Sequence, residues 1–378
     1  MEWKEYTLGD ISKMKYGKLP PKGDILDGNY PINSGYRIIG YCDKKNCNKG
    51  TILVVARGVG GCGDVKITHE DCYLTNLSIS IEIDESICRP YYFYYLHQIK
   101  NLSHLNSGSA QPQITIDSLL KYPIKIPSII EQDRIITILS SLDAKIENNN
   151  KINANLEAQA AALFKSWFVD FEPFKDGEFV ESELGMIPKG WKVGTLLDYN
   201  SIVMGQSPSG SSYNEEQIGC EFYQGCADFG LRFPRKRVYT TEPNRYAESN
   251  SVLMSVRAPV GTLNVARHRC CIGRGLASIK SNIGCDSYTL YLMKSIKNIL
   301  DTFNGDGTVF GSINKKSLEC IKVIVPSLSV IKNYEAKINP LDSYYRKNSD
   351  ENQRLSSLRD TLLPKLMSGE IDLDNIKL

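Results

Sequence analysis

The stretch IITILSSLDAKIENNNKINANLEAQAAALFKSW, from Ile135 to Trp167, decides the fold of this chain. Its seam residues recur in steps that alternate four and three, with two asparagines at the centre: Ile135, Leu139, Leu142, Ile146, Asn149, Asn153, Leu156, Ala160, Leu163 and Trp167. This heptad spacing is typical of a two-stranded coiled coil, whereas a helix lying on a globular domain needs a broader apolar face. The pattern therefore predicts a long helix that pairs with another long helix.

The partner pattern begins 199 residues later (135 to 334) and repeats both asparagines. Its seam is Tyr334, Ile338, Leu341, Tyr345, Asn348, Asn352, Leu355, Arg359, Leu362 and Leu366. A buried asparagine is satisfied only opposite another polar group, so it fixes register and orientation. An antiparallel pair would place Asn149 beside Asn352 and Asn153 beside Asn348. At 1.5 Å per residue, each segment would be about 50 Å long.

A break in the first helix is the alternative interpretation. Asn148, Asn149, Asn150 and Asn153 are poor helix formers, so they could separate two shorter helices. The heptad phase continues across the asparagines in both copies, which favours continuous helices.

Composition indicates a globular protein with more than one domain. The chain has 378 residues, 42% hydrophobic and 23% charged, with a formal net charge of +2. Such a low net charge argues against indiscriminate coating of nucleic acid but allows a local basic surface. We find no apolar run long enough for a membrane span and no secretory signal, so we expect a cytoplasmic protein that makes no membrane contact. Eleven cysteines without a CxxC pair predict reduced, mostly buried thiols.

The globular parts are duplicated as well. Trp3 to Asp10 is echoed by 191–198, Thr51 to Arg57 by 251–257, and Gly108 to Leu119 by 307–318. The offset grows between the first two pairs, so the second copy carries about a dozen extra residues before its buried strand.

These repeats predict an α+β fold with two similar mixed α/β domains, separated by an antiparallel coiled coil of two long helices and related by a pseudo-twofold axis. Residues 170–190 are acidic and rich in Gly and Pro, which predicts a linker rather than a regular element. The expected boundaries are 1–127 for domain 1, 128–169 for spacer helix 1, 170–190 for the linker, 191–326 for domain 2, 327–368 for spacer helix 2 and 369–378 for the tail.

Several motifs give the chain a family resemblance over nearly its whole length. They are Tyr30-Pro-Ile-Asn-Ser-Gly35, Asn106-Ser-Gly-Ser-Ala-Gln-Pro-Gln-Ile114, Glu131-Gln132, Leu163-Phe-Lys-Ser-Trp-Phe168, Gly205-Gln-Ser-Pro208, Leu253-Met-Ser-Val-Arg-Ala-Pro-Val-Gly261, Cys271-Ile-Gly-Arg-Gly-Leu276 and Leu363-Pro-Lys-Leu-Met-Ser-Gly369. With these motifs the chain resembles the specificity subunit of type I restriction-modification systems. Arg359 in place of Ala160, and Tyr334 and Tyr345 in place of Ile135 and Ile146, depart from a uniform seam.

The resemblance implies a non-catalytic subunit that reads a bipartite site on double-stranded DNA through two target-recognition domains. It also implies that two modification subunits, which bind S-adenosylmethionine and methylate adenine, dock mainly on the helices. Restriction-translocase subunits, with ATP and Mg, would join for cleavage. We expect no cofactor and no metal in this chain.

Candidate DNA contacts are cations and amides in loops, because Arg and Gln can pair with base edges and Lys and Arg with phosphates. Arg57 and Arg257 each precede a turn, Gln111 and Gln113 lie in a polar loop, and residues 232–245 form the most basic local run. The candidates are Arg57, Lys66, Gln111, Gln113, Arg232, Arg235, Lys236, Arg237, Arg257, Arg274, Thr308 and Lys315. An internal salt bridge is the alternative for the arginines, and a solvated surface for the basic run.

Catalytic motifs are not evident. Gly58 to Gly63 fits G-x-G-x-x-G, but residues 64–68 are expected to form a strand, whereas a phosphate loop should open a helix. Leu19-Pro-Pro-Lys22 lacks the acidic or amide residue and the aromatic residue of the adenine methyltransferase motif, and we find no P-loop. Two alternatives stay open: a self-contained DNA-modifying enzyme, and a coiled-coil scaffold whose globules bind protein.

Overall fold

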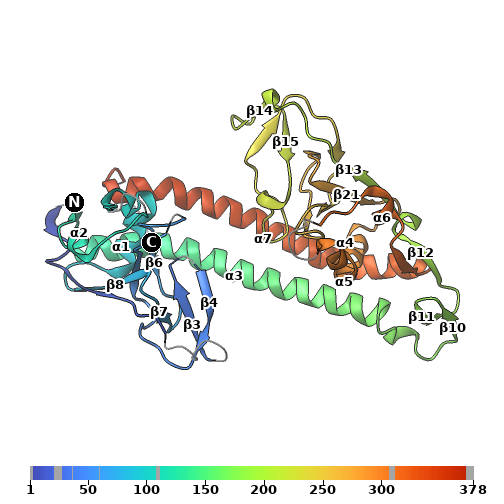
Figure 1. The fold of residues 1–378 in the computed structure, drawn as a ribbon, viewed down its shortest axis with the longest axis horizontal. Coiled ribbons are helices and arrows are strands. Elements are labelled where there is room, and N and C mark those ends of the chain that lie inside the picture. Colours follow the sequence, from blue (N-terminus) through green and yellow to red (C-terminus); the bar gives the residue numbers. More distant parts are fainter. Residues whose placement is uncertain are drawn as a thin grey trace. The chain divides into compact units, whose positions relative to one another are not determined.

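The computed structural model describes residues 3–20, 28–35, 37–58, 60–107, 111–305 and 311–371 (Figure 1). The chain divides into two compact units. Unit 1 comprises Met1–Asn149 and Asp350–Leu378, and unit 2 comprises Asn150–Ser349. Each unit therefore contains one globular domain and about half of each long helix.

Unit 1 begins with eight short strands followed by helices. Its strands are β1 (Lys4–Thr7), β2 (Ser12–Tyr16), β3 (Tyr30–Ser34), β4 (Arg37–Cys42), β5 (Ile52–Val55), β6 (Val65–Ile67), β7 (Tyr73–Leu74), β8 (Ser78–Ile83) and β9 (Pro123–Ile126). Its globular helices are α1 (Pro90–Ile99), η1 (Leu102–Leu105) and α2 (Ile116–Leu120). The strands form sheets in the orders β2-β8-β5-β6, β4-β3-β7 and β1-β9.

Unit 2 repeats this arrangement. Its strands are β12 (Lys192–Thr195), β13 (Asn200–Met204), β14 (Tyr213–Asn214), β15 (Cys220–Tyr223), β16 (Val238–Thr240), β17 (Tyr246–Ala247), β18 (Val252–Ser255), β19 (Leu263–Val265), β20 (Cys270–Ile272), β21 (Leu276–Ser281) and β22 (Lys322–Val325). Its globular helices are η3 (Leu196–Asp198), η4 (Gly210–Ser212), η5 (Cys226–Asp228), α4 (Asp286–Ser295), α5 (Lys297–Asp301), η6 (Thr302–Asn304) and α6 (Lys315–Glu319).

The sheet orders show that the two globules share a common arrangement, to which unit 2 adds β14 and β17 at the edges of one sheet. In unit 2 they are β13-β21-β18-β19, β14-β16-β15-β20-β17 and β12-β22. The strand β3 pairs in parallel with β7, as β15 does with β20, while the other strand pairs are antiparallel. The predicted pair of similar mixed α/β domains joined by long helices is confirmed.

The extra residues of the second copy lie in a single loop. In unit 1, residues 35–36 connect β3 to β4, whereas in unit 2 residues 224–237 connect β15 to β16. We call residues 224–237 the insertion loop. It contacts β19 because the backbone amide of Val265 donates to the carbonyl of Arg232 at 2.8 Å and the side-chain amide of Asn264 to the carbonyl of Gly230 at 2.9 Å.

The long helices α3 (Ile129–Phe168) and α7 (Leu328–Ser368) are uninterrupted, as Figure 1 shows. They contain 40 and 41 residues, so each is about 60 Å long. The helix α3 starts early because Ser128 and Glu131 cap it: the Ser128 amide donates to Oε2 of Glu131 at 3.0 Å. The prediction of continuous helices is confirmed, and the alternative of a break at the asparagines is wrong.

The central asparagines pair as the antiparallel arrangement predicts. In unit 1, Nδ2 of Asn149 donates to Oδ1 of Asn352 at 2.9 Å. In unit 2, Nδ2 of Asn348 donates to Oδ1 of Asn153 at 3.0 Å. Both pairs fit one register, so the larger residues in the second seam do not shift it.

All the other seam side chains are buried or half-buried. Buried members are Ile135, Leu139, Leu156, Ala160, Tyr334, Ile338, Tyr345 and Leu366, and half-buried ones are Leu142, Ile146, Leu163, Trp167, Leu341, Leu355, Arg359 and Leu362. Unit 1 extends its core with Leu363 and Met367, and unit 2 with Phe164, Phe168 and Ile331. The heptad pattern did not predict that these residues are buried, because they lie on an additional face of each helix that the globule covers.

The expectation of a linker without regular structure is wrong. Residues 170–190 contain η2 (Glu172–Phe174) and the hairpin of β10 (Phe179–Ser182) with β11 (Gly185–Pro188). The rings of Phe171 and Phe174 pack edge-on against Trp191, with centroids 5.6 and 5.0 Å away. The Gly and Pro residues therefore mark turns between short elements.

All eleven cysteines are free thiols, and eight of them are buried. Among the helices of the described residues, none has the length and apolar character needed to cross a membrane.

Candidate nucleic-acid interface

In unit 1, the end of β5 is held beside the polar loop of residues 106–113. Arg57 and Gln113 form an antiparallel bridge. The amide of Gln113 donates to Oδ1 of Asn106 at 2.7 Å, which fixes the loop. Arg57 is half-buried, and its Nε is buried without a hydrogen-bond partner in the described part of the chain. Gln111 is exposed. The structure thus brings together three of the candidate residues.

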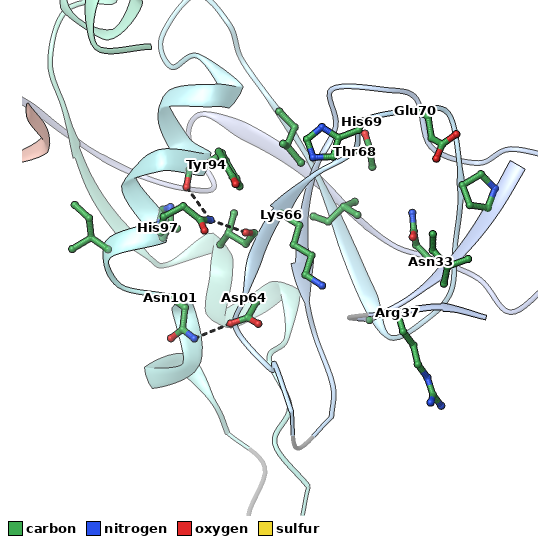
Figure 2. A pocket seen from close by; sticks show the side chains of 18 of the residues that line it. Asn33, Arg37, Asp64, Lys66, Thr68, His69, Glu70, Tyr94, His97 and Asn101 are labelled. Carbon is green, nitrogen blue, oxygen red and sulfur yellow. Dashed lines mark hydrogen bonds between the residues drawn. The ribbon is translucent and has the colours of Figure 1, made fainter. Parts of the chain in front are cut away.

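A second feature of unit 1 is an open cavity of about 810 Å³ between β3, β4, β6 and α1. Figure 2 shows Lys66 extending from β6 between Asn33 and Arg37 on one side and Tyr94 and Asn101 on the other. Lys100 and His69 also line this cavity, as do two acidic residues, Asp64 and Glu70.

Burial lowers the pKa of Lys66, and the nearby Asp64 carboxylate partly offsets this. Asp64 accepts a hydrogen bond from the side-chain amide of Asn101 at 3.0 Å. His97, on α1, is buried, which lowers its pKa to about 4 and keeps the ring neutral near pH 7. The Lys66 ammonium is therefore a partly desolvated cation in an open cavity, which favours an anionic ligand such as a phosphate.

Unit 2 has the equivalent strand end. Arg257 bridges to Ser312, and the Ala258 amide donates to the carbonyl of Gly311 at 3.0 Å. Arg257 is exposed. Lys315, also exposed, is the first residue of α6, and its Nζ forms an ion pair with Oε1 of Glu319 at 3.5 Å. Thr308 lies outside the described residues.

Arg274 is displayed on the exposed turn between β20 and β21. Its amide donates to Oγ of Ser207 at 3.2 Å, and that hydroxyl donates to Oε1 of Gln224 at 3.0 Å. A Cβ at Gly205 would lie 2.2 Å from the carbonyl oxygen of Gly273, so these two segments approach as closely as glycine permits. Two motifs that are far apart in the sequence therefore form one polar turn.

Sequence reasoning missed Ser207 and Gln224 because their link to Arg274 joins segments that are far apart in the sequence. In unit 1, the Lys18 amide donates to the Leu74 carbonyl at 2.9 Å, as the Gln206 amide does to Ile272 at 3.0 Å. Lys18 is exposed, so it is a further candidate that the repeat offset could have identified.

The basic run on the insertion loop is exposed at Arg235, Lys236 and Arg237. Lys236 pairs with Glu221 at 2.6 Å, and Arg237 is bidentate to Asp228 at 2.8 and 3.2 Å. Within the described ranges, no carboxylate pairs with Arg235. A phosphate would therefore meet Arg235 directly, but would compete with carboxylates for the other two cations.

The assignment of Arg232 as a DNA contact is wrong. Its side chain is only 5% exposed and pairs with Asp342, and its Nη2 donates to the hydroxyl of Tyr291 at 2.6 Å. The ring of Tyr345 lies 4.2 Å from its guanidinium carbon. A guanidinium buried among these groups forms an internal ion pair and is not available to DNA.

The glycine-rich segment after β5 is a strand connection, as the sequence predicted. The next regular element is the strand β6, not a helix. Gly63 has φ +97°, and a Cβ there would lie 2.2 Å from the Ser103 nitrogen, which explains the glycine without a nucleotide. Among the described residues, we find no cluster of His, Cys, Asp and Glu that could hold a metal ion.

Comparisons with family models and with known proteins all indicate the same family. The model of the type I restriction modification DNA specificity domain matches residues 1–158 and 188–359. The MjaX specificity subunit of Methanocaldococcus jannaschii is 35% identical over 291 residues, which cover 75% of this chain and 68% of that protein. The type I restriction enzyme HindI specificity subunit of Haemophilus influenzae is 27% identical over 467 residues, with 98% and 100% covered.

A solved structure has the same fold. It is the type I restriction-modification system S subunit from M. genitalium, with 21% identity, a TM-score of 0.61, and coverage of 97% of this chain and 96% of that one.

Proposed function

Because this chain belongs to the type I restriction-modification DNA specificity family, we propose that it reads a bipartite double-stranded DNA site with one half read by each unit. The chain is the DNA sequence-specificity subunit and not the catalyst of such a system. One observation carries the proposal: Arg57 and Arg257, at the ends of matching strands, form matching antiparallel bridges to Gln113 and Ser312. A duplicated surface of this kind suits two half-sites.

The proposed contacts follow from side-chain chemistry. In unit 1 they are Arg57, Gln111, Gln113 and Lys66, with Arg37 and Lys18 added. In unit 2 they are Arg235, Lys236, Arg237, Arg257, Arg274, Thr308 and Lys315. Arg and Gln can bond base edges in the major groove, while the lysines neutralise phosphates.

Partner subunits would supply the chemistry. We propose that two modification subunits, which bind S-adenosylmethionine, dock along α3 and α7, and that restriction-translocase subunits using ATP and Mg join them. A modification subunit would flip the target adenine into its own pocket. The complex would act in the cytoplasm, where its DNA lies. Exposed apolar residues on the helices, such as Ile130, Tyr344 and Leu358, are compatible with such docking.

Lengthening both helices tests the proposed spacing role. We would insert one heptad between 151 and 152 and another between 349 and 350, between the two asparagine pairs, so that neither globule changes. Seven residues add about 10 Å, which corresponds to about three base pairs at about 3.4 Å each. Mapping of methylated adenines in cells with the partner subunit should show the same half-sites and a longer spacer.

The control is an insertion in α3 alone, which mismatches the asparagine pairs and should abolish site selection. Changed half-sites with an unchanged spacer in the double insertion would show that the helices do not set the distance.

A second test assigns each half-site to a unit. Arg57→Ala should reduce selectivity at one half-site and Arg257→Ala at the other, by about tenfold at the contacted position. Equal loss at both half-sites from either variant would contradict one unit per half-site.

A further inference from the structure

An aspartate occupies the same position in both long helices, Asp143 in α3 and Asp342 in α7. Each accepts a hydrogen bond from a tyrosine of the adjacent globular helix. In unit 1, the hydroxyl of Tyr95 donates to Asp143 at 2.6 Å, and in unit 2 that of Tyr291 donates to Asp342 at 3.4 Å. Each carboxylate is only partly exposed, so it needs a nearby cation.

The cation comes from different places in the two units. In unit 1, Arg359 of α7 donates to Asp143 at 2.8 Å. The corresponding residue of α3 in unit 2 is Ala160, which cannot do this. Arg232 of the insertion loop pairs with Asp342 instead. The insertion therefore supplies the charge that the helix lacks.

The charges around Arg232 are balanced. Its Nε lies 3.8 Å from Oε2 of Glu157 on α3, and Glu157 also pairs with Lys294 on α4. Two cations thus face two carboxylates, Glu157 and Asp342. Removal of Arg232 alone would leave an uncompensated carboxylate, whereas joint removal of Arg232 and Asp342 leaves the Glu157–Lys294 pair neutral.

A second anchor follows Arg232 directly. The ring of Phe233 contacts two guanidinium groups, with the carbon of Arg267 at 4.3 Å and that of Arg346 at 4.9 Å from its centroid. Arg346 belongs to α7, so two successive loop residues are fixed to that helix or to residues that touch it. The exposed cations Arg235, Lys236 and Arg237 begin two residues later.

We propose that Arg232 is a positioning residue that fixes the insertion loop to the helix pair, so that DNA selection by unit 2 depends on a buried ion pair between loop and helix. This rests on the proposed DNA-reading function. The counterpart in unit 1, Asp143 with Arg359, joins the two long helices and involves no loop. Arg232 acts through the loop and does not touch DNA. The side chains it positions are Arg235 and its two basic neighbours, which would lose their fixed placement if the anchor were released.

The test compares two matched double variants of the full-length chain. Arg232→Gln with Asp342→Asn removes the anchor in unit 2, and Arg359→Gln with Asp143→Asn removes the equivalent pair in unit 1, where no insertion depends on it. Hydrogen–deuterium exchange measures the loop directly. The Arg235 amide, which donates to the Asp228 carbonyl at 2.7 Å, and the Val265 amide should exchange about tenfold faster or more in the first variant only.

Selection from randomised duplexes measures the consequence for DNA. The first variant should lose about tenfold selectivity at the half-site that also responds to Arg257→Ala, and keep the other half-site. Unchanged exchange over 224–237 would overturn the anchor. Faster exchange with an unchanged half-site would overturn its role in selection. A wild-type chain that selects no DNA would refute the proposed function, while the exchange result would still decide the anchor.

Should the double variant unfold, Arg232→Lys provides the same comparison. It keeps the charge beside Asp342 but cannot also reach Tyr291, so an intermediate exchange rate is expected. Wild-type exchange in this variant would contradict the requirement for the guanidinium.

Discussion

The two asparagine pairs differ in burial and in the number of hydrogen-bond partners. This difference predicts how much unfolding free energy is lost when one asparagine of each pair is replaced. In unit 2, Asn153 and Asn348 are both 3% exposed, and Oδ1 of Asn153 accepts from Nδ2 of Asn348. Asn348→Ala leaves this buried carbonyl without its donor, which costs about 1–3 kcal/mol. In unit 1, Nδ2 of Asn149 donates both to Asn352 and to Glu351, the latter at 2.8 Å.

Asn352→Ala is therefore the milder change, because Glu351 still accepts from Asn149 and Asn352 itself is only half-buried. We expect it to cost about 1 kcal/mol, the value of a typical hydrogen bond. Urea unfolding followed by far-UV circular dichroism would measure the free energy of unfolding for both variants. If Asn352→Ala destabilises the protein as much as Asn348→Ala does, the second acceptor is not what distinguishes the two pairs.

Four further predictions rest on single residues, three of them in unit 1 and one in unit 2. Burial lowers the pKa of His97 from its ordinary 6.5 to about 4 in the folded state, so as the pH falls the unfolded chain binds the proton first. Stability should fall by up to about 3 kcal/mol as the pH drops from 6.5 to 4, and His97→Phe should remove that slope in urea titrations. Gln132, fully buried, accepts from the Arg89 amide and donates to two carbonyls, so Gln132→Leu should cost about 3 kcal/mol of unfolding free energy. Ile331 of unit 2 occupies the position that corresponds to Gln132 and is also fully buried. We expect Ile331→Gln to lower the unfolding free energy too, because each side chain fits only its own unit. Gly63→Ala should lower the melting temperature of unit 1, whereas an unchanged melting temperature would contradict a steric role for this glycine.

The sequence was sufficient for the helices because their pattern is local and repeated. Heptad spacing survives across the asparagines in both copies, and a buried amide has few acceptable partners. Asn149 and Asn352 could therefore be paired without coordinates. Few of the short strands were predicted from the sequence: the buried run that repeats as 52–55 and 252–255, and the strand expected over 64–68. The hairpin in residues 170–190 was missed because Gly and Pro mark turns inside a short element as readily as they mark a linker.

The candidate interface was harder to predict, because a cation looks the same in sequence whether it faces solvent or a buried carboxylate. Arg232 and Arg235 lie three residues apart in one basic run, yet the first is buried and the second is exposed. The deciding partner, Asp342, is 110 residues away. Lys66 lines an open cavity, but nothing in the residues next to it in the sequence predicted that cavity.

A signal for Arg232 was nevertheless present in the repeat. Asp143 and Asp342 correspond at the same offset as the asparagines, and so do Ala160 and Arg359. Both repeats have the aspartate, but Arg359, which faces Asp143, corresponds to Ala160 on the side of Asp342. Asp342 therefore needs a cation from elsewhere, because a carboxylate partly removed from water is costly without one. The extra residues of the second copy are the obvious source, since they have no counterpart in the first. Comparison of charges between the two repeats, instead of along the chain, therefore separates the arginine that is buried in an ion pair from those that stay exposed on the insertion loop.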